Sequence, residues 1–246
     1  MKAATTTGRI HSWDLSTGVD GPGTRFVLFV NGCPLRCLYC ANPDTWRMRD
    51  GREATVDEVM AEIEKYRPFI TTAGGGVTIT GGEPLLQPAF TGAVLRRCRE
   101  AGLHTALDTS GFLGARATDD LLADTDLVLL DIKSFDTNTY RKLTGGTLAP
   151  TLNFATRLDR LGKRMWIRYV LVPGWTDAPV AVDGLARFVA GLAGVDRVDI
   201  LPFHKLGAAK YEALGLPFPL RDTPSPTPDL VRRVREQFRA RGVNAC

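Results

Sequence analysis

Three cysteines within eight residues carry the strongest chemical signal in the chain. They lie in the segment Cys33-Pro-Leu-Arg-Cys37-Leu-Tyr-Cys40. Thiolates are natural ligands of zinc and of iron–sulfur clusters. A structural zinc site uses four protein ligands, whereas a cluster held by three cysteines leaves one iron open to a small molecule. The spacing therefore favours a catalytic cluster over a closed structural site.

The other cysteines and the histidines supply no clear fourth ligand. Cys98 falls in an expected helix and Cys246 is the last residue. The histidines are scattered along the chain: His11, His104 and His204. A Cys3His zinc site stays open as an alternative, as do three buried thiols acting as small hydrophobic groups. Pro34 and Arg36 favour a loop, which counts against the buried thiols.

Short apolar runs alternate with helical patterns along the chain. The expected strands are Phe26–Val30, Val77–Thr80, Thr105–Leu107, Leu127–Leu130, Trp166–Leu171 and Val198–Leu201. The expected helices are one capped at Thr55, then Pro88–Ala101, Thr118–Ala123, Thr151–Leu161, Pro179–Leu192 and one beginning at Thr227-Pro228. This alternation predicts an α/β fold with a parallel sheet and right-handed crossovers. The sheet forms either part of a barrel or an open, doubly wound layer.

Residues able to bind a ligand follow each expected strand. They are Cys33–Cys40, Thr80-Gly81-Gly82-Glu83, Asp108-Thr109-Ser110, Asp131-Ile132-Lys133, Arg168 within the fifth strand, and Pro202-Phe203-His204. Parallel strands bring their carboxyl ends to one face, where such folds place active sites, and this recurrence favours the barrel. Simpler interpretations remain: a plain Gly-Gly turn, aspartates as helix caps, surface salt bridges for Lys133 and Arg168, and a core position for His204.

Composition limits the class of protein. The 246 residues are 44% apolar and 24% charged, which is typical of a soluble globular domain. The net charge of +4 is mild, and nothing resembles a nucleic-acid-binding patch before the C-terminal end. No apolar run is long enough to span a bilayer, and Met1–Gly8 lacks the apolar centre of a signal peptide. We therefore expect a cytoplasmic protein, in line with its odd number of cysteines.

The C-x3-C-x2-C spacing resembles the signature of the radical S-adenosylmethionine superfamily. The resemblance implies a 4Fe–4S cluster on Cys33, Cys37 and Cys40, whose open iron binds S-adenosylmethionine. It also implies reductive cleavage of that cofactor to methionine and a 5′-deoxyadenosyl radical. The turn Gly81-Gly82-Glu83 looks like the superfamily loop that holds the amino group of the cofactor.

Further segments look like the family of pyruvate formate-lyase activating enzymes. They are Gly8–Ser12, Val19–Gly23, Arg25-Phe26, Asn42, Asp44–Trp46, Trp166–Val170, Val172–Trp175 and Leu201–Gly207. The resemblance implies a partial (β/α)6 TIM-like barrel of the radical SAM type. It implies a single domain over residues 1–246, with a core at about 20–210, an N-terminal strand and loop extension and a packed C-terminal helix. The substrate implied is a glycine α-carbon of pyruvate formate-lyase.

The resemblance also implies the remaining site residues. The implied cofactor-binding residues are Tyr39, Ala41, Gly81, Gly82, Glu83, Asp131, Ile132, Lys133, Arg168 and His204. A monovalent cation is expected at Asp108, Thr109 and Asp131, with the Leu129 carbonyl as a weaker candidate. Asp20 and Gly21 are expected to receive the substrate peptide, although a plain β-turn explains them equally well.

The implied partners are pyruvate formate-lyase and an electron donor, flavodoxin or ferredoxin, and we expect a monomer. Arginines on the last helix are a candidate docking site for an acidic donor: Arg232, Arg233, Arg235, Arg239 and Arg241. Two positions depart from the family pattern, because Ala41 replaces the usual His and Ser110 a common Asn. The alternatives are activation of another glycyl radical enzyme, a small substrate, or a zinc-binding scaffold. The chain lacks the extra cysteine clusters of longer activating enzymes, which favours the shorter type.

Overall fold

The computed structural model describes residues 6–246. Met1–Thr5, which belong to the segment searched for a signal peptide, lie outside the described residues. The strands are β1 Thr7–Thr17, β2 Thr24–Val30, β3 Arg52–Thr55, β4 Gly76–Gly81, β5 His104–Thr109, β6 Leu127–Asp131, β7 Arg164–Leu171 and β8 Val195–Pro202. The α-helices are α1 Val56–Thr72, α2 Pro88–Glu100, α3 Asp119–Ala123, α4 Thr137–Thr144, α5 Ala149–Arg160, α6 Pro179–Ala190, α7 Ala208–Ala213 and α8 Pro228–Arg239.

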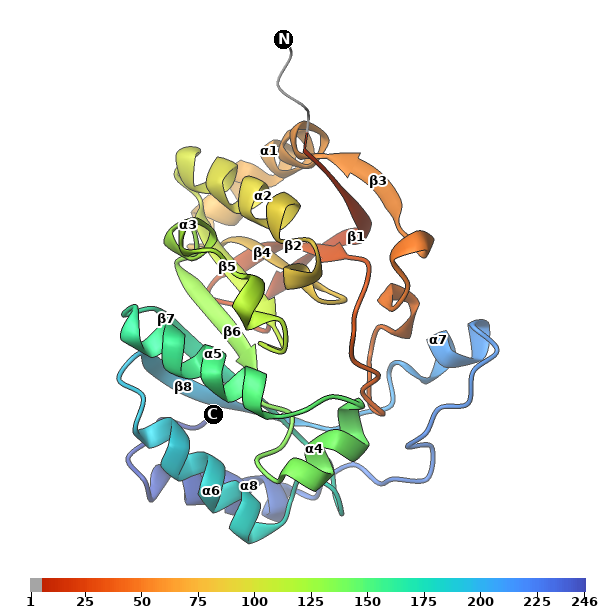
Figure 1. The fold of residues 1–246 in the computed structure, drawn as a ribbon, viewed down its shortest axis with the longest axis vertical. Helices are drawn as coiled ribbons and strands as arrows, with labels where there is room; N and C mark the ends of the chain where they lie inside the picture. The colour runs from red at the N-terminus through yellow and green to blue at the C-terminus, as the bar shows by residue number, and fades with distance from the viewer. Residues whose placement is uncertain (1–5) are drawn as a thin grey trace. The chain divides into compact units, whose positions relative to one another are not determined.

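The strands form one sheet in the order β3-β1-β2-β4-β5-β6-β7-β8 (Figure 1). Strand β2 runs parallel to β4, β4 to β5 and β7 to β8, whereas β1 is antiparallel to β2 and β3. The predicted α/β fold with a mostly parallel sheet is confirmed. The sheet does not close on itself, as a partial barrel requires.

The described chain divides into two compact units. The first comprises residues up to Pro34 together with Thr45–Thr109 and Leu113–Leu129, and the second comprises Leu35–Asp44, Ser110–Phe112 and Leu130–Cys246. The assignment of residues 1–246 to a single radical SAM domain stays a prediction. Each unit is described by itself below.

In the first unit, α1 packs on β2, β3 and β4, and α2 packs on β1 and β5. The expected capping box begins α1, since the Thr55 hydroxyl accepts from the Glu58 N–H and the Glu58 carboxylate accepts from the Thr55 N–H. Strands β2 and β4 are almost wholly buried, as expected of the mostly apolar strands of a parallel sheet. This layer fixes the carboxyl ends of β2, β4 and β5 along one edge.

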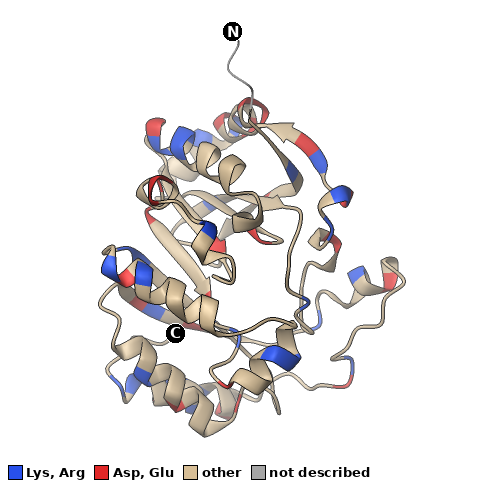
Figure 2. Cartoon of the chain, viewed as in Figure 1, with Lys and Arg blue, Asp and Glu red and all other residues tan. Residues whose placement is uncertain are grey.

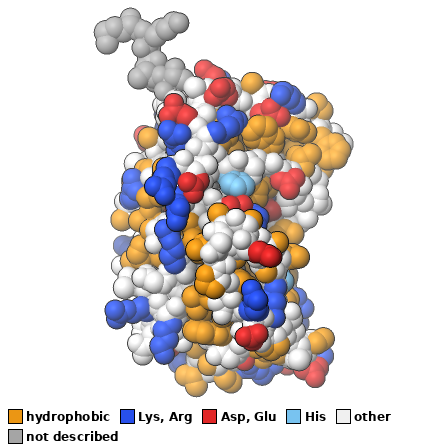
Figure 3. Space-filling model, turned by 90° about the vertical axis from the view of Figure 1, so that its right-hand side faces the viewer, with side chains coloured by type: hydrophobic (Ala, Val, Ile, Leu, Met, Phe, Trp, Pro, Cys, Tyr) orange, Lys and Arg blue, Asp and Glu red, His pale blue; other side chains and the backbone are white. Residues whose placement is uncertain are grey.

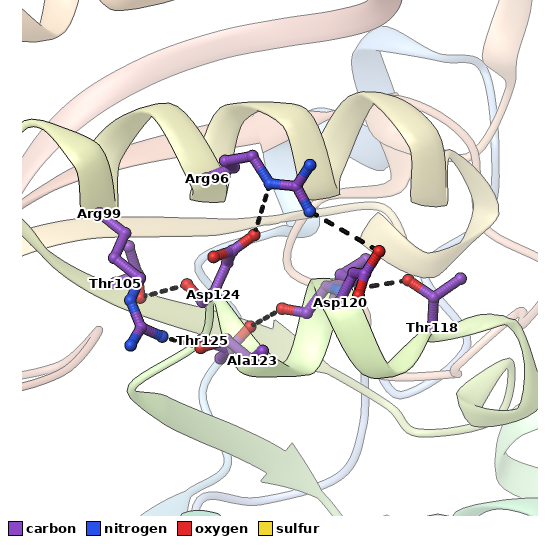
Figure 4. A network of polar contacts seen from close by, with 9 residues as sticks. Arg96, Arg99, Thr105, Thr118, Asp120, Ala123, Asp124 and Thr125 are labelled. Carbon is purple, nitrogen blue, oxygen red and sulfur yellow. Dashed lines mark hydrogen bonds and ion pairs between the residues drawn. The ribbon is translucent and has the colours of Figure 1, made fainter.

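Polar contacts join α3 and its C-cap residue Asp124 to α2 and to β5 in the same unit (Figure 4). The Arg96 guanidinium lies 3.0 Å from the Asp124 carboxylate and 3.8 Å from that of Asp120. Thr105 Oγ1 donates to the Asp124 carbonyl at 2.8 Å, and Arg99 donates to the Ala123 carbonyl. The Thr118 hydroxyl caps α3, at the residue where the sequence predicts a helix to begin.

In the second unit, α5 packs on β7 and α8 packs on β8 and α6. The Thr227 hydroxyl caps α8 where the sequence predicts the helix to begin. Val231, Val234 and Phe238 are buried, while Leu230 is half-buried. Residues at the C-terminus extend the sheet edge, because the Val198 N–H donates to Asn244 and Ile200 to Cys246. Helices α4 and α7 and strand β3 were not predicted. Helix α4 is mostly polar, with only Tyr140 and Leu143 as large apolar side chains, and β3 and α7 show no clear hydrophobic period.

Among residues 6–246, the structure contains no helix whose length and hydropathy suit a membrane span.

Candidate active site

The first unit fixes the start of the cysteine loop through backbone hydrogen bonds. Directly after β2, the Gly32 N–H donates to the Thr45 carbonyl at 2.7 Å, and the Cys33 N–H donates to the Trp46 carbonyl at 3.1 Å. Gly32 has a φ of +93°, a conformation that favours glycine. The chain thus leaves the buried strand in a defined turn and presents Cys33 at the carboxyl edge of the sheet.

The Gly81-Gly82-Glu83 turn packs against this segment. The Gly82 N–H donates to the Val30 carbonyl and the Glu83 N–H to the Gly32 carbonyl, both at 2.8 Å. A Cβ atom on Gly82 would lie 2.3 Å from the Gly32 carbonyl oxygen, closer than real Cβ contacts come. The two glycines are therefore required by the close approach of two backbones next to Cys33.

Carboxylates at the ends of β4 and β5 are held by threonine hydroxyls. The Glu83 side chain is 1% exposed and accepts from Thr109 Oγ1 at 2.6 Å and from the Leu85 N–H at 3.1 Å. Asp108 accepts from Thr80 Oγ1 at 2.8 Å. The structure thus brings Glu83, Asp108 and Thr109 to the same edge, as predicted. The expected cofactor contact of Glu83 and the cation site at Asp108 and Thr109 stay predictions.

The second unit carries the rest of the cysteine loop. The Arg36 N–H donates to the Thr144 carbonyl at 2.8 Å, and the Leu38 N–H donates to the Leu143 carbonyl at 2.9 Å. The last turn of α4 therefore supports the residues on both sides of Cys37. Helix α4 ends there at Gly145 in the left-handed conformation, a common helix C-terminus.

The three thiols suit a metal cluster. Cys33, Cys37 and Cys40 are each partly exposed thiols in one short loop. Burial raises the pKa of the Cys37 thiol to about 12, and the nearby Cys40 raises it further while Lys133 opposes the shift. A positively charged metal offsets that penalty, because ligand thiols bind as thiolates. Among residues 6–246, no three His, Cys, Asp or Glu side chains are arranged to hold a single metal ion.

Asp131, Ile132 and Lys133 lie at the end of β6, where Asp131 and Lys133 form an ion pair. Lys133 Nζ lies 2.6 Å from the Asp131 carboxylate and 5.8 Å from the centre of the Tyr39 ring. Burial opposes the charge on Lys133, but Asp131, Tyr39 and Cys37 together raise the pKa of the ammonium well above its usual value. The Ile132 N–H donates to the Arg168 carbonyl at 3.1 Å, which ties this strand end to β7.

A segment after β8 packs on the cysteine loop, which sequence reasoning missed. A Cβ atom on Gly207 would lie 2.9 Å from the Cys40 carbonyl oxygen, and Lys210 Nζ lies 2.8 Å from Asn42 Oδ1 and 3.0 Å from Asp44 Oδ2. Burial raises the pKa of the Tyr211 hydroxyl, and the Cys40 and Cys37 thiols raise it further. Spacing gives no signal for contacts between residues so distant in the sequence.

Two predicted positions lie in unexpected surroundings. His204 is exposed, and its Nδ1 accepts from the Leu206 N–H at 3.3 Å, so the core interpretation is wrong and its cofactor contact stays a prediction.

Asp20 and Gly21 precede β2, whereas Cys33 follows it. The seven residues of β2 span roughly 20 Å at about 3.3 Å per residue, so the expected peptide site and Cys33 lie at opposite ends of the strand.

Comparison with known proteins agrees with this arrangement. A family model described as the radical SAM superfamily matches residues 27–183. The chain belongs to the radical SAM superfamily. It is 45% identical to the pyruvate formate-lyase-activating enzyme of Clostridium pasteurianum, over 87% of this chain and 90% of that enzyme. It is 42% identical to the pyruvate formate-lyase 1-activating enzyme of Escherichia coli strain K12, over 93% of this chain and 94% of that enzyme.

A solved structure also resembles this radical SAM protein. A domain of the pyruvate-formate lyase-activating enzyme from Bacteroides vulgatus is 25% identical, with a TM-score of 0.60, and the match covers 70% of this chain and 98% of that domain. Membership of the superfamily implies a 4Fe–4S cluster and S-adenosylmethionine. It also favours the radical interpretation of the three thiols over the zinc-binding scaffold.

Proposed function

We propose that this radical SAM protein activates pyruvate formate-lyase under anaerobic conditions by generating a glycyl radical on it. The observation that carries the proposal is the cysteine loop at the end of β2, in a chain 42–45% identical to pyruvate formate-lyase-activating enzymes over most of its length. When bound, the cluster and S-adenosylmethionine supply a one-electron cleavage whose deoxyadenosyl product takes the α-hydrogen of a glycine.

The residues of this chain bind and orient those groups. Cys33, Cys37 and Cys40 would hold the cluster, and three thiolates leave one iron to the cofactor. The turn at Gly81-Gly82-Glu83 would hold the amino group of the cofactor, supported by the close backbone packing that places it beside Cys33. The remaining proposed cofactor contacts are Tyr39, Ala41, Asp131, Ile132, Lys133, Arg168 and His204.

A monovalent cation remains part of the proposal. Asp108, Thr109 and Asp131 would supply oxygen ligands, with the Leu129 carbonyl as a further candidate. Carboxylate, hydroxyl and carbonyl oxygens are the ligands that hard cations prefer. Titration of the cluster-loaded protein with potassium and sodium salts, read out as S-adenosylmethionine affinity, tests this part. The Asp108→Asn variant should lose the cation dependence.

The remaining assignments concern partners and location. Pyruvate formate-lyase is the proposed protein substrate, and flavodoxin or ferredoxin the proposed electron donor of a monomeric enzyme. Asp20 and Gly21 keep their proposed role with the substrate peptide, which must then reach from that turn to the other end of β2. A cytoplasmic location is supported by the five cysteines, which are thiols rather than disulfides.

The decisive experiment is an anaerobic activation assay. Reconstituted protein reduced with dithionite, S-adenosylmethionine and pyruvate formate-lyase should give 5′-deoxyadenosine and a glycyl signal in electron paramagnetic resonance. Cys33→Ala, Cys37→Ala and Cys40→Ala should each abolish cleavage. Deoxyadenosine without a glycyl signal would indicate a small substrate instead.

A second candidate partner is a different glycyl radical enzyme. Ala41 and Ser110 replace residues usual in the family, which favours this alternative. Supplying several glycyl radical enzymes in the same assay separates the two. A glycyl signal on another enzyme and none on pyruvate formate-lyase would reassign the partner.

A further inference from the structure

The segment that follows β8 contains a preformed hollow on the surface. It has a volume of about 540 Å³ and is lined by Lys205, Ala208, Tyr211, Glu212, Gly215, Leu216, Phe218 and Arg221. We call Lys205–Arg221 the α7 segment. Figure 3 views the molecule from the side on which α7 lies in Figure 1, where apolar side chains stand beside basic and acidic ones.

Aromatic packing makes the hollow rigid. The Phe218 ring lies 5.1 Å from the Tyr211 ring in an edge-on arrangement and stacks on Phe203 at 6.4 Å. Lys205 Nζ donates to the Arg221 carbonyl at 2.5 Å, which joins the two ends of the segment. The surface is therefore built before any partner arrives, and little ordering is needed on binding.

The α7 segment exposes apolar side chains. Leu206 is 80% exposed, Leu214 42% and Leu216 36%, and Leu216 lines the hollow. Single exposed leucines are common, but three in one short segment are typical of a protein-binding surface. The lining of the hollow contains two basic residues, Lys205 and Arg221, and one acidic residue, Glu212. In Figure 2 the α7 segment carries both basic and acidic residues.

The back of the α7 segment contacts the cysteine loop. Gly207 packs on the Cys40 backbone, and Lys210 binds Asn42 and Asp44. Tyr211 of the same segment lines the hollow. The segment that forms the hollow therefore also packs on a cluster ligand.

We propose that the α7 segment is the docking surface for the electron donor, a small acidic one-electron carrier protein. This inference rests on the proposed function, which consumes one electron for each cofactor cleaved. The carrier loses one electron and the cluster gains one, and no bond is made or broken. A surface whose segment packs on the Cys40 backbone through Gly207 gives that electron a short path. The excess of basic over acidic residues in the hollow matches an acidic carrier.

The substrate protein is the competing occupant. Its glycine must reach the cofactor itself, whereas a donor need only approach a cluster ligand. The residues that line the hollow include none of Asp131, Lys133 and Arg168, which are the proposed cofactor contacts of the same unit. The observations therefore favour the donor.

Four of the five arginines on or just after α8 are engaged elsewhere, which weakens the group as an alternative docking site. Arg241 binds Asp183, Arg239 donates to the Ala245 carbonyl at 2.7 Å, and Arg233 donates to the Asp177 carbonyl at 2.6 Å. Arg232 binds Asp229 within its own helix. These contacts explain those four arginines as supports of the C-terminal helix.

The test compares two reductants of the same cluster. The double variant Leu206→Asp/Arg221→Glu changes one exposed apolar and one basic side chain of the α7 segment. Its matched control, Val180→Asp/Arg232→Glu, makes the same changes on α6 and α8, where Val180 is 83% exposed. Anaerobic stopped-flow absorbance follows reduction of the reconstituted cluster by reduced flavodoxin and, separately, by dithionite.

We expect the second-order rate constant with flavodoxin to fall at least tenfold in the α7 variant and to stay within twofold in the control. Dithionite should reduce both at the wild-type rate. The single variant Leu214→Asp, in the same segment, should slow reduction by flavodoxin and leave reduction by dithionite unchanged. It replaces the double variant if that variant retains no cluster. An unchanged rate in the α7 variants, or an equal loss in the control, would overturn the proposal.

Two further outcomes separate this inference from the proposed function. A higher KM for pyruvate formate-lyase, with the flavodoxin rate unchanged, would assign the surface to the substrate protein and overturn the donor proposal. Failure of dithionite-reduced wild-type protein to cleave S-adenosylmethionine would contradict the proposed function. Cluster reduction by flavodoxin would still be measurable in that case and would still decide the docking question.

Discussion

Thr109 donates a hydrogen bond of 2.6 Å from its hydroxyl to the buried carboxylate of Glu83. The bond joins the ends of β4 and β5 directly beside the turn that supports Cys33. Glu83 is 1% exposed, so its charge depends on these donors in place of water. Glu83 thus links the stability of this sheet edge to the position of the turn Gly81-Gly82-Glu83, the proposed cofactor loop.

Replacing Thr109 by Val should therefore destabilise the protein. The variant keeps the shape but removes the donor, and hydrogen bonds to charged groups contribute about 1.5–3 kcal/mol. We expect the free energy of unfolding in urea to fall by about 2 kcal/mol and the affinity for S-adenosylmethionine to weaken. Thr109→Ser is the matched control, because it keeps the hydroxyl. Equal stability of the Val and Ser variants would show that the bond contributes nothing.

Gly82→Ala should disturb the cluster site. A Cβ atom there would lie 2.3 Å from the Gly32 carbonyl oxygen, and both partners are backbone, so the segment before Cys33 must shift. We expect iron bound per chain after anaerobic reconstitution to fall by more than half. Gly92→Ala is the control, because its Cβ would meet Leu121 at an ordinary 3.6 Å within α2. That change should stabilise the helix by about 0.5–1 kcal/mol. Full iron content in Gly82→Ala would contradict the proposed packing.

Much of the fold was predictable because the signals are local. The mostly apolar runs at β2, β4 and β6 and the capping box at Thr55 each specify their own element within a few residues. The strand-end motifs were predicted to share one edge because parallel strands allow no other arrangement. Within the first unit, Glu83, Asp108 and Thr109 lie together as that argument requires.

The missed parts depend on contacts between distant residues. Lys210 and Asn42 are 168 positions apart, and no spacing rule relates them. Arg25 was noted only as part of a family resemblance, although it is fully buried and makes several hydrogen bonds. A charged residue within an otherwise apolar strand was the available signal, because a buried arginine needs partners.

Arg25→Lys tests that buried residue. Its guanidinium donates to Thr78 Oγ1 at 2.9 Å and to the Val77 carbonyl at 2.5 Å, and lies 2.9 Å from His104 Nδ1. Burial lowers the pKa of Arg25 to about 10 against the opposing charges of Asp126 and Asp20. An ammonium cannot reach all these partners from one point. We expect a loss of about 2–4 kcal/mol in the free energy of unfolding. The exposed Arg116→Lys should change it by under about 0.5 kcal/mol, and similar losses in both would argue against the buried network.

Cys98 should give the protein an alkaline pH dependence that is separate from the cluster. It is 0% exposed, its Sγ lies 3.8 Å from Met60 Sδ, and burial raises the pKa of its thiol from 9.0 to about 12. A raised folded-state pKa contributes stability that is fully present below pH 9 and is lost as the pH rises toward 12, because only the unfolded chain releases the proton.

Comparison with Cys98→Ala isolates this effect, since all other titrating groups are shared. At pH 8 the variant should be less stable by about 1–2 kcal/mol, owing to the lost packing of the thiol. Between pH 8 and 10 the stability advantage of the wild type should shrink by about 1 kcal/mol, as the unfolded thiol ionises. Denaturation of the cluster-free chains under reducing conditions measures both values. The variant should still bind a full cluster, because Cys98 lies in α2 and takes no part in the cysteine loop. A constant difference across that pH range would mean that Cys98 ionises equally in both states, and loss of iron would make it a ligand.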